Sequence, residues 1–190
     1  MSKSITYRII SKLGINLSSG EYENITFLGA VRRGLIGYFK MILLKYCMYS
    51  VFLSPFNYRL IRPYLWKKMG CKVGKKVFIG YGVWLDCNHA NLIEIGDNVH
   101  ITNMCLLLCH QRDLDNYFVG VDASSLPYKR NKIIIEDGVM IGMNTTIMPG
   151  VKIGKGAIIG AKSLVINDIP SWTMAAGNPA KVIKNIRDNK

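Results

Sequence analysis

Residues 133–165 read IIIEDGVMIGMNTTIMPGVKIGKGAIIGAKSLV, and the spacing within this stretch decides the fold. An aliphatic residue recurs at every sixth position, and two earlier blocks of the chain keep the same spacing. The leading aliphatic positions are Val73, Ile79, Leu85, Ile95, Ile101, Leu107, Ile135, Ile141, Ile147, Ile153, Ile159 and Val165. A second small or apolar residue follows four places later at Val77, Val83, Val99, Cys105, Val139, Thr145, Val151, Ala157 and Ser163.

A period of six residues fits neither an amphipathic helix nor a half-buried hairpin. It fits short strands joined by tight turns, in which each strand points one aliphatic side chain into a narrow interior and Gly or Asn allows a positive φ. Three such hexads close one triangular coil, and successive coils stack at an inter-strand spacing of about 4.8 Å. The sequence therefore predicts an all-β core, a parallel β-helix of hexapeptide repeats.

The repeat is interrupted twice. Between Leu85 and Ile95 there are four residues more than one hexad needs, so a small excursion around residues 87–91 leaves the coil. Between Leu107 and Ile135 a longer segment has no hexad pattern, and we predict an inserted loop over residues 108–132. Long loops on a rigid scaffold are where binding and catalytic residues are usually placed.

The chain has 190 residues, of which 49% are apolar and 19% charged, and this composition excludes a disordered protein. The formal net charge is +13, and the excess lies in residues 1–80, which contain 14 Lys and Arg against Glu21 and Glu23. We predict three regions: a basic, apolar, helical arm over residues 1–70, the β-helix over 71–170, and a C-terminal tail over 171–190.

The segment from Leu35 to Leu53 is long enough to be weighed as a membrane span, but Lys40 and Lys45 lie inside it. Its aliphatic and aromatic residues favour insertion by about 3–5 kcal/mol, whereas two central lysines oppose it by about 5–7 kcal/mol. With basic residues on both sides, the segment is typical of a helix on an anionic membrane surface. The alternative is a helix packed on the β-helix or on a neighbouring subunit, burying Phe39, Leu43 and Tyr46.

The five cysteines are an odd number and contain no Cys-x-x-Cys pair, which disfavours a disulfide framework and favours a reducing compartment. Residues 1–20 lack the continuous apolar core of a cleavable signal peptide. We therefore expect a cytoplasmic protein, with peripheral contact at the inner face of the membrane through the arm. The absence of a nucleic-acid motif predicts no nucleic-acid partner.

The chain resembles the hexapeptide-repeat acetyltransferases, closest in pattern to those that O-acetylate sugars and polysaccharides. The resemblance rests on IEIGDNVHI (93–101), CHQRD (109–113), the repeat of residues 133–170 and AAGNPAKVIK (175–184). It implies a left-handed β-helix, a homotrimer, and acetyl-coenzyme A as the acetyl donor, bound in a groove between adjacent subunits.

The same resemblance assigns a general base to the histidine near the start of the inserted loop, which is His110. A neutral imidazole can take the proton of an attacking hydroxyl at ordinary pH. No acyl-enzyme is required, so Cys105 and Cys109 are expected to be packing residues rather than nucleophiles.

For the acceptor, the resemblance points to Asp86, where a carboxylate contacts the substrate or orients the base, and we add Asn88 beside it. Asp113, just beyond His110, is a rival orienting or acceptor-binding residue. His89, in the small excursion, is near the predicted acceptor cleft. His100 precedes a leading aliphatic residue and is expected on the surface.

For the donor, the resemblance implies that backbone groups near the coil corners bind pantetheine and that two lysines meet the phosphates. The matching positions are Met143, Ala161, Ile166, Lys181 and Lys184. The chain departs from the family pattern at Lys162, where Gly is common, at Asn167, where a basic residue is usual, and at Met140, where Trp is frequent.

The sequence thus predicts an acetyl-coenzyme A dependent O-acetyltransferase that modifies a sugar or a lipid-linked glycan in capsule, exopolysaccharide or O-antigen biosynthesis. An antibiotic or xenobiotic acetyltransferase and a non-catalytic hexapeptide scaffold are the alternatives. A metal hydratase needs three converging histidines. His89, His100 and His110 are 11 and 10 residues apart, off the 3 × 6 = 18-residue coil period, so we predict no metal cofactor.

Overall fold

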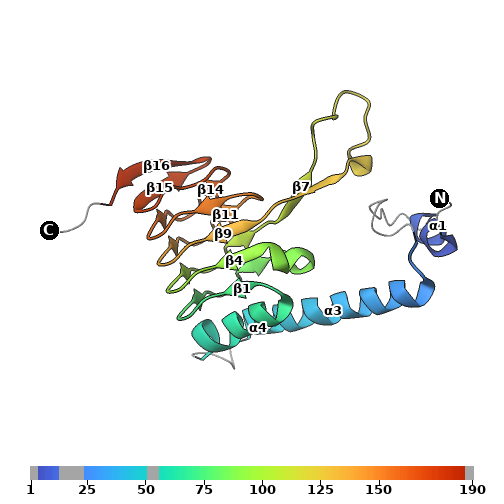
Figure 1. The fold of residues 1–190 in the computed structure, drawn as a ribbon, viewed down its shortest axis with the longest axis horizontal. Helices are drawn as coiled ribbons and strands as arrows, with labels where there is room; N and C mark the ends of the chain where they lie inside the picture. The colour runs from blue at the N-terminus through green and yellow to red at the C-terminus, as the bar shows by residue number, and fades with distance from the viewer. Residues whose placement is uncertain (1–3, 13–23, 51–55, 187–190) are drawn as a thin grey trace. The chain divides into compact units, whose positions relative to one another are not determined.

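A computed structural model of the protein describes residues 4–12, 24–50 and 56–186, and Figure 1 shows it as a ribbon. The chain divides into two compact units. The larger unit consists of residues 41–110 and 130–190, and the smaller unit of residues 1–40 and 111–129. The predicted regional boundaries at residues 70 and 170 remain predictions.

The larger unit is a left-handed parallel β-helix with three sheets, which confirms the predicted fold class. The first sheet contains β1 (Lys72–Val73), β4 (Ile93–Ile95), β9 (Ile133–Ile135) and β12 (Lys152–Ile153). The second contains β2 (Phe78–Ile79), β5 (His100–Ile101), β10 (Met140–Ile141), β13 (Ile158–Ile159), β15 (Thr173–Gly177) and β16 (Ala180–Asn185). The third contains β3 (Trp84–Leu85), β6 (Leu106–Leu107), β11 (Thr146–Ile147) and β14 (Leu164–Val165).

The register of the strands places the leading aliphatic residues in columns. In the first sheet Ile95 pairs with Val73 on one side and with Ile135 on the other, and Ile135 pairs with Ile153. All four of these side chains are buried in the single core of the β-helix. One aliphatic residue per hexad therefore fills the interior, as the spacing predicts.

The corners between strands require unusual backbone conformations. Positive φ angles occur at the non-glycine residues Lys76, Asn98, Met104, Asn144, Lys162 and Trp172. Lys162, which departs from the family pattern of Gly, has a φ of 58°. Stacked corners also approach closely: a Cβ atom on Gly142 would lie 2.4 Å from the backbone nitrogen of Ala161.

The first coil is covered by the helical segment that precedes it. The π-helix η1 (Asn57–Ile61) leads into α4 (Arg62–Met69), and Trp66 and Met69 of α4 join the core. The buried guanidinium of Arg62 donates to the carbonyl of Ile79 at 3.1 Å and to that of Met48 at 2.8 Å. α4 and the β-helix are thus tied together by both packing and hydrogen bonds.

The long helix α3 (Phe27–Tyr49) contributes only its last turns to this core, through Leu44, Cys47 and Met48. Packing on the β-helix would bury Leu43 and Tyr46, but they are 47% and 59% exposed, and packing of the helix on a neighbouring subunit remains a prediction. No helix in the described parts of the chain is both long and apolar enough to cross a membrane.

At the opposite end of the β-helix, β15 pairs in parallel with β13 and antiparallel with β16. β16 therefore closes the edge of the second sheet with a hairpin rather than with another coil (Figure 1). A cis peptide bond joins Asn178 to Pro179 between the two strands.

The smaller unit contains α1 (Ile5–Lys12), the first half of α3 and most of the inserted loop. The loop begins with β7 (His110–Arg112), passes through the 3₁₀ turn η3 (Ala123–Ser125) and returns along β8 (Tyr128–Arg130), which pairs with β7. Within it the guanidinium of Arg112 lies 4.1 Å from the centre of the Tyr128 ring.

Candidate active site

Asp86 and His110 are brought together by the stacking of the third sheet. β3 and β6 pair in parallel, with Leu85 opposite Leu107, so the residues that follow the two strands lie at the same corner of the β-helix. Asp86 comes directly after β3, and its backbone N–H donates to the carbonyl of Leu107 at 3.2 Å. His110 begins β7, three places after Leu107.

A third side chain reaches the same carboxylate. Asp86 is followed by the 3₁₀ helix η2 (Cys87–Leu92), and the turn of this helix brings the His89 side chain back to the Asp86 carboxylate. The Nδ1 atom of His89 lies 3.1 Å from both carboxylate oxygens of Asp86, and the Nδ1 atom of His110 bonds to Oδ2 of the same carboxylate. The two imidazole rings are 5.2 Å apart, so the three side chains form one cluster.

The carboxylate of Asp86 is the buried centre of this cluster. Its side chain is 4% exposed, whereas those of His89 and His110 are 21% and 35% exposed. Burial acts to raise the pKa of the Asp86 carboxyl, but the hydrogen bonds and charges of His110 and His89 outweigh burial and hold the pKa below its usual value. Asp86 is therefore ionised at neutral pH.

The charge on Asp86 fixes the tautomers of both histidines. An ionised carboxylate only accepts hydrogen bonds, so each Nδ1 atom that faces it must carry a proton. In a neutral His110 ring the lone pair then resides on Nε2. That is the protonation state a general base requires.

The role of His89 was not predicted from the sequence beyond its nearness to the acceptor cleft. One signal for it exists: His89 is three residues after Asp86 in a short excursion, and a single helical turn brings such residues side by side. His100 lies elsewhere, on β5, with its ring 4.1 Å from that of Phe78.

The other two predicted acceptor-binding residues have separate surroundings. Asn88 is exposed in η2, between the residues of the cluster. Asp113 belongs to the smaller unit, where its carboxylate lies 2.9 Å from the ammonium group of Lys129. Contact of either residue with a substrate remains a prediction.

Two of the predicted donor-binding positions are neighbours on successive coils. Met143 and Ala161 are exposed and follow β10 and β13, and the N–H of Lys162 donates to the carbonyl of Met143 at 2.8 Å. Lys181 and Lys184 are exposed on β16, in the same sheet. The exposed Ile166 instead follows β14 of the third sheet. Donor binding by these five residues remains a prediction.

The cysteines near the cluster have the properties of packing residues. Cys105 and Cys109 are 1% and 0% exposed. Burial, with a contribution from the charge of Asp86, raises the pKa of the Cys109 thiol to about 12. Burial also raises the pKa of Cys105. Both thiols stay protonated at neutral pH, which supports the prediction that neither is a nucleophile.

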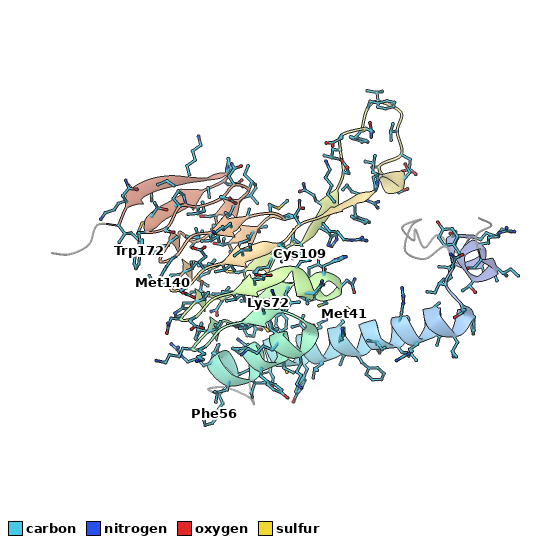
Figure 2. The ribbon with its side chains drawn as sticks, viewed as in Figure 1. Met41, Phe56, Lys72, Cys109, Met140 and Trp172 are labelled. Atoms are coloured by element: carbon cyan, nitrogen blue, oxygen red, sulfur yellow. The ribbon has the colours of Figure 1, made fainter. Side chains whose placement is uncertain are left out.

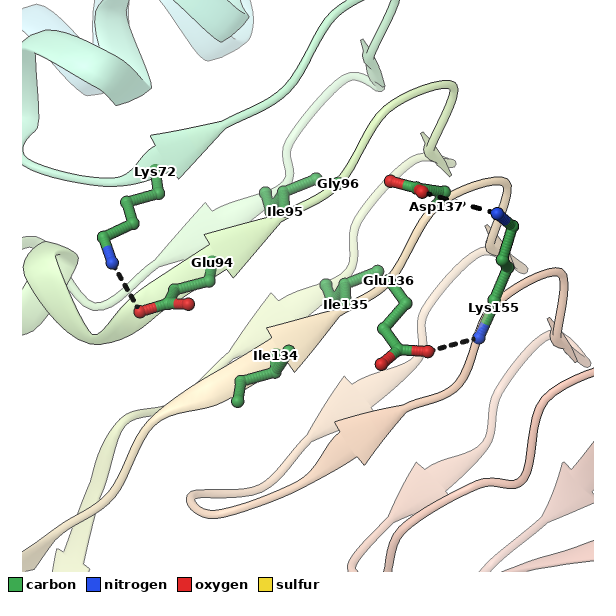
Figure 3. A pocket seen from close by; sticks show the side chains of 9 residues that line it. All are labelled: Lys72, Glu94, Ile95, Gly96, Ile134, Ile135, Glu136, Asp137 and Lys155. Carbon is green, nitrogen blue, oxygen red and sulfur yellow. Dashed lines mark hydrogen bonds and ion pairs between the residues drawn. The ribbon is translucent and has the colours of Figure 1, made fainter.

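Two hollows lie away from this cluster. The first, on the outer face of the first sheet, is shown in Figure 3. Its charges neutralise one another, because Glu94 pairs with Lys72 at 3.0 Å and with Lys132 at 2.9 Å, and Glu136 pairs with Lys152 at 2.8 Å. Lys72, Glu94 and Lys152 lie on strands of the first sheet, and Lys132 and Glu136 flank β9, so the five residues form a ladder of surface ion pairs across successive coils.

The second hollow is lined by Met140, Ile158 and Trp172 together with Asp137 and Lys155. Met140 and Trp172 are labelled in Figure 2, where they lie on the same side of the β-helix. Neither hollow contains a residue predicted to bind donor or acceptor.

The relatives found by comparison with known proteins are named as acetyltransferases. The family described as "Bacterial transferase hexapeptide (six repeats)" matches residues 132–167. A protein of Bacillus subtilis (strain 168) named "Putative acetyltransferase YvoF" is 33% identical over 162 residues, 85% of this chain and 81% of that protein. A 2,3,4,5-tetrahydropyridine-2,6-dicarboxylate N-acetyltransferase of Clostridium perfringens (strain SM101 / Type A) is 48% identical over 60 residues, 32% of this chain but only 25% of that enzyme.

Solved structures share the fold. A hexapeptide-repeat acetyltransferase of Vibrio cholerae O1 biovar eltor, complexed with acetyl-coenzyme A, gives a TM-score of 0.65 at 22% identity and covers 93% of this chain and 99% of its own. A maltose O-acetyltransferase of Clostridium difficile 630 gives 0.61 at 23% identity and covers 80% and 87%. Fold, repeat and the long alignment to the Bacillus relative agree: the chain belongs to the hexapeptide-repeat acetyltransferase family.

Proposed function

We propose that the protein transfers an acetyl group from acetyl-coenzyme A to a hydroxyl group of a sugar, with His110 as general base. The observation that carries the proposal is the hydrogen bond between the Nδ1 atom of His110 and the ionised, buried carboxylate of Asp86. The bound acetyl-coenzyme A of the Vibrio neighbour and the maltose O-acetyltransferase with the same fold support the donor and the acceptor class.

His110, held by Asp86, can carry the one proton that the reaction moves, from the acceptor hydroxyl to the leaving thiolate. As the acceptor hydroxyl attacks the thioester carbonyl, its proton passes to Nε2 of His110. The positive imidazolium that forms is stabilised by the carboxylate of Asp86, which keeps its own charge. When the C–S bond breaks, the imidazolium returns the proton to the leaving thiolate, so the protein ends the cycle unchanged.

We propose further that the acceptor is a lipid-linked glycan and that α3 holds the enzyme at an anionic membrane surface, as capsule, exopolysaccharide or O-antigen assembly would require. No acidic residue occurs between Asn24 and Leu85, while that stretch contains eleven lysines and arginines. The large apolar side chains exposed on α3 are Phe27, Leu28, Val31, Leu35, Ile36, Tyr38, Phe39, Met41, Ile42, Leu43, Tyr46 and Tyr49. Apolar area combined with positive charge is what binds helices to acidic lipids.

The donor site is proposed to lie between subunits of a homotrimer, in keeping with the family resemblance. The exposed side chains of Met143 and Ile166 support this, because a second chain can cover them. Light scattering on the active protein should give three times the chain mass of 21.4 kDa, and an active monomer would contradict the proposal.

The test of the proposed activity is release of free coenzyme A thiol with a panel of acceptors, followed by mass analysis of the product. The panel should contain free sugars, lipid-linked glycans, amino-sugars and aminoglycoside antibiotics. An O-acetylated glycan is the expected product. An N-acetylated product would move the protein to amine acetylation, and no thiol release with any acceptor would favour a non-catalytic scaffold.

A further inference from the structure

We propose that His89, His110 and Asp86 form a binding site for a divalent cation of the zinc type, and that the cation switches off His110 as a base. The ligands are the Nδ1 atoms of the two histidines and the carboxylate between them. These donor atoms all lie within 4.8 Å of one another, and the cluster is unique in this respect among the residues that the structure describes.

The spacing between His89 and Asp86 matches two ligands of a tetrahedral site. Zinc binds imidazole nitrogen and carboxylate oxygen at about 2.0–2.1 Å, so two ligand atoms of a tetrahedron lie about 3.3 Å apart. The Nδ1 atom of His89 is 3.1 Å from both carboxylate oxygens of Asp86. The His89–Asp86 pair therefore already has the spacing of two zinc ligands, whereas the His110 ring, whose Nδ1 atom lies in a short hydrogen bond to Oδ2, must move back to admit the cation.

The chemistry of the donors also fits a cation of this type. Two imidazole nitrogens with one carboxylate suit zinc, which binds both kinds of ligand, better than magnesium or calcium, which prefer oxygen alone. Three protein ligands leave a fourth position for water. The carboxylate is buried, with a side chain that is 4% exposed, and is held in place by both histidines.

Cation binding and base catalysis exclude each other at His110. A neutral imidazole has one N–H proton, and in the catalytic form that proton is on Nδ1, facing Asp86. A cation on Nδ1 moves the proton to Nε2, which then has no lone pair to accept the acceptor's proton. This switching rests on the proposed function, whereas the binding itself does not. The cation is an inhibitor here and takes no part in acetyl transfer.

The probe is Co²⁺, whose visible absorption reports tetrahedral coordination, with Zn²⁺ as competitor. The wild-type protein is expected to bind one Co²⁺ per chain and to release it to Zn²⁺. His89→Asn keeps an amide that can donate to Asp86 but removes a ligand, and should weaken binding by about 100-fold or more. His100→Asn, at the one histidine outside the cluster, is the matched control and should bind as wild type does.

Binding can also be followed without any substitution, by nitrogen NMR of the three histidines in the wild-type protein. The Nδ1 signals of His89 and His110 should shift with Zn²⁺, while those of His100 should not. Equal Co²⁺ binding by wild type and His89→Asn, or unshifted Nδ1 signals, would overturn the site and place any bound metal elsewhere.

The switch is measured as thiol release with and without Zn²⁺. Added Zn²⁺ should abolish the turnover of the wild-type protein, and a chelator should restore it. The turnover of His89→Asn should be the same with and without Zn²⁺. Stoichiometric binding that leaves wild-type turnover unchanged would overturn the switch and count against His110 as base. If the wild-type protein binds the cation at this site but shows no acetyl transfer even without Zn²⁺, the proposed function is contradicted and the cation site is not.

Discussion

His110 is the residue on which the proposed reaction depends. His110→Ala should lower kcat by roughly 10²- to 10⁴-fold, the usual contribution of a general base, with little change in donor affinity. The coenzyme A release assay measures both quantities. His100→Ala is the control, because its ring lies on β5 against Phe78. A folded His110→Ala protein with near-normal turnover would refute the assignment.

Asp86 is expected to act through His110 rather than on the substrate. Asp86→Asn lets an amide N–H face Nδ1 and favours the wrong tautomer of His110, so kcat should fall by about 10²-fold or more. The double variant with His110→Ala should be no slower than His110→Ala alone, because residues that act as a unit are not additive. A further loss in the double variant would indicate a separate role for Asp86.

The same carboxylate makes stability depend on pH. Its pKa in the folded protein lies below the usual value, so its stabilising contribution is complete above the unfolded pKa of about 3.9 and is lost as pH falls through the folded pKa. Urea unfolding at pH 7 and near pH 3 should show wild type losing its advantage over Asp86→Asn at the lower pH. An advantage that does not change with pH would contradict this charge assignment.

At the residue scale, His110 was predicted from the CHQRD motif, and Asp86 from a position at which similar sugar-modifying enzymes carry a carboxylate or an amide. The contact of His89 with Asp86 was not predicted. His89 and His100 are 11 residues apart, which does not match the coil period. The coil period does not describe η2, whose turn brings His89 back to Asp86. Local turns outside a repeat have no periodicity from which contacts can be predicted.

The coil corners are the elements most sensitive to an added side chain. Gly142→Ala places a Cβ atom 2.4 Å from the backbone nitrogen of Ala161, and backbone of a packed coil cannot move away easily. The free energy of unfolding should fall by about 2 kcal/mol or more.

A matched glycine lies in a helix. Gly34→Ala in α3 meets nothing within 4 Å and should raise the free energy of unfolding slightly, by about 0.5–1 kcal/mol, because alanine favours helices. Denaturant unfolding of both variants measures the contrast. Equal effects would mean that the corners repack more freely than the stacked backbone suggests.

At the element scale the strands and the presence of N-terminal helices were predictable, but the buried face of α3 was not. The column Val73, Ile95, Ile135 and Ile153 follows directly from one aliphatic residue per hexad. α3 is apolar around most of its circumference, so no stripe distinguishes the buried Leu44 and Met48 from the exposed Leu43. Burial there depends on tertiary contact with the first coil.

For the whole molecule, the proposed membrane contact depends on charge. Arg32→Gln with Arg33→Gln should weaken binding to acidic vesicles roughly tenfold or more at low salt, since each basic residue near such a surface contributes about 1 kcal/mol. Added salt should weaken wild-type binding because screening acts over about 8 Å at physiological ionic strength.

Vesicle sedimentation of the full chain measures membrane binding, and the soluble-acceptor assay measures whether the variant still transfers the acetyl group. Turnover on a soluble acceptor should not change in the arginine variant. Lys152→Gln with Lys155→Gln removes the same charge from the ion-paired face of the β-helix and is the control. Equal loss of vesicle binding in both variants would assign the effect to net charge rather than to α3.

The segments at the two ends of the β-helix affect whether one molecule can associate end to end with another at high concentration. A stack of identical coils is an open-ended template, whose last strands expose backbone groups to any similar chain. Here the carbonyl of Ile79 is occupied by Arg62 and the N–H of Gly82 by the carbonyl of Met48, while the antiparallel β16 presents Lys181 and Lys184 at the other end. Arg62 and Met48 occupy backbone groups of the first coil, and the lysines of β16 place positive charge at the edge of the second sheet, so both ends disfavour the addition of a like chain.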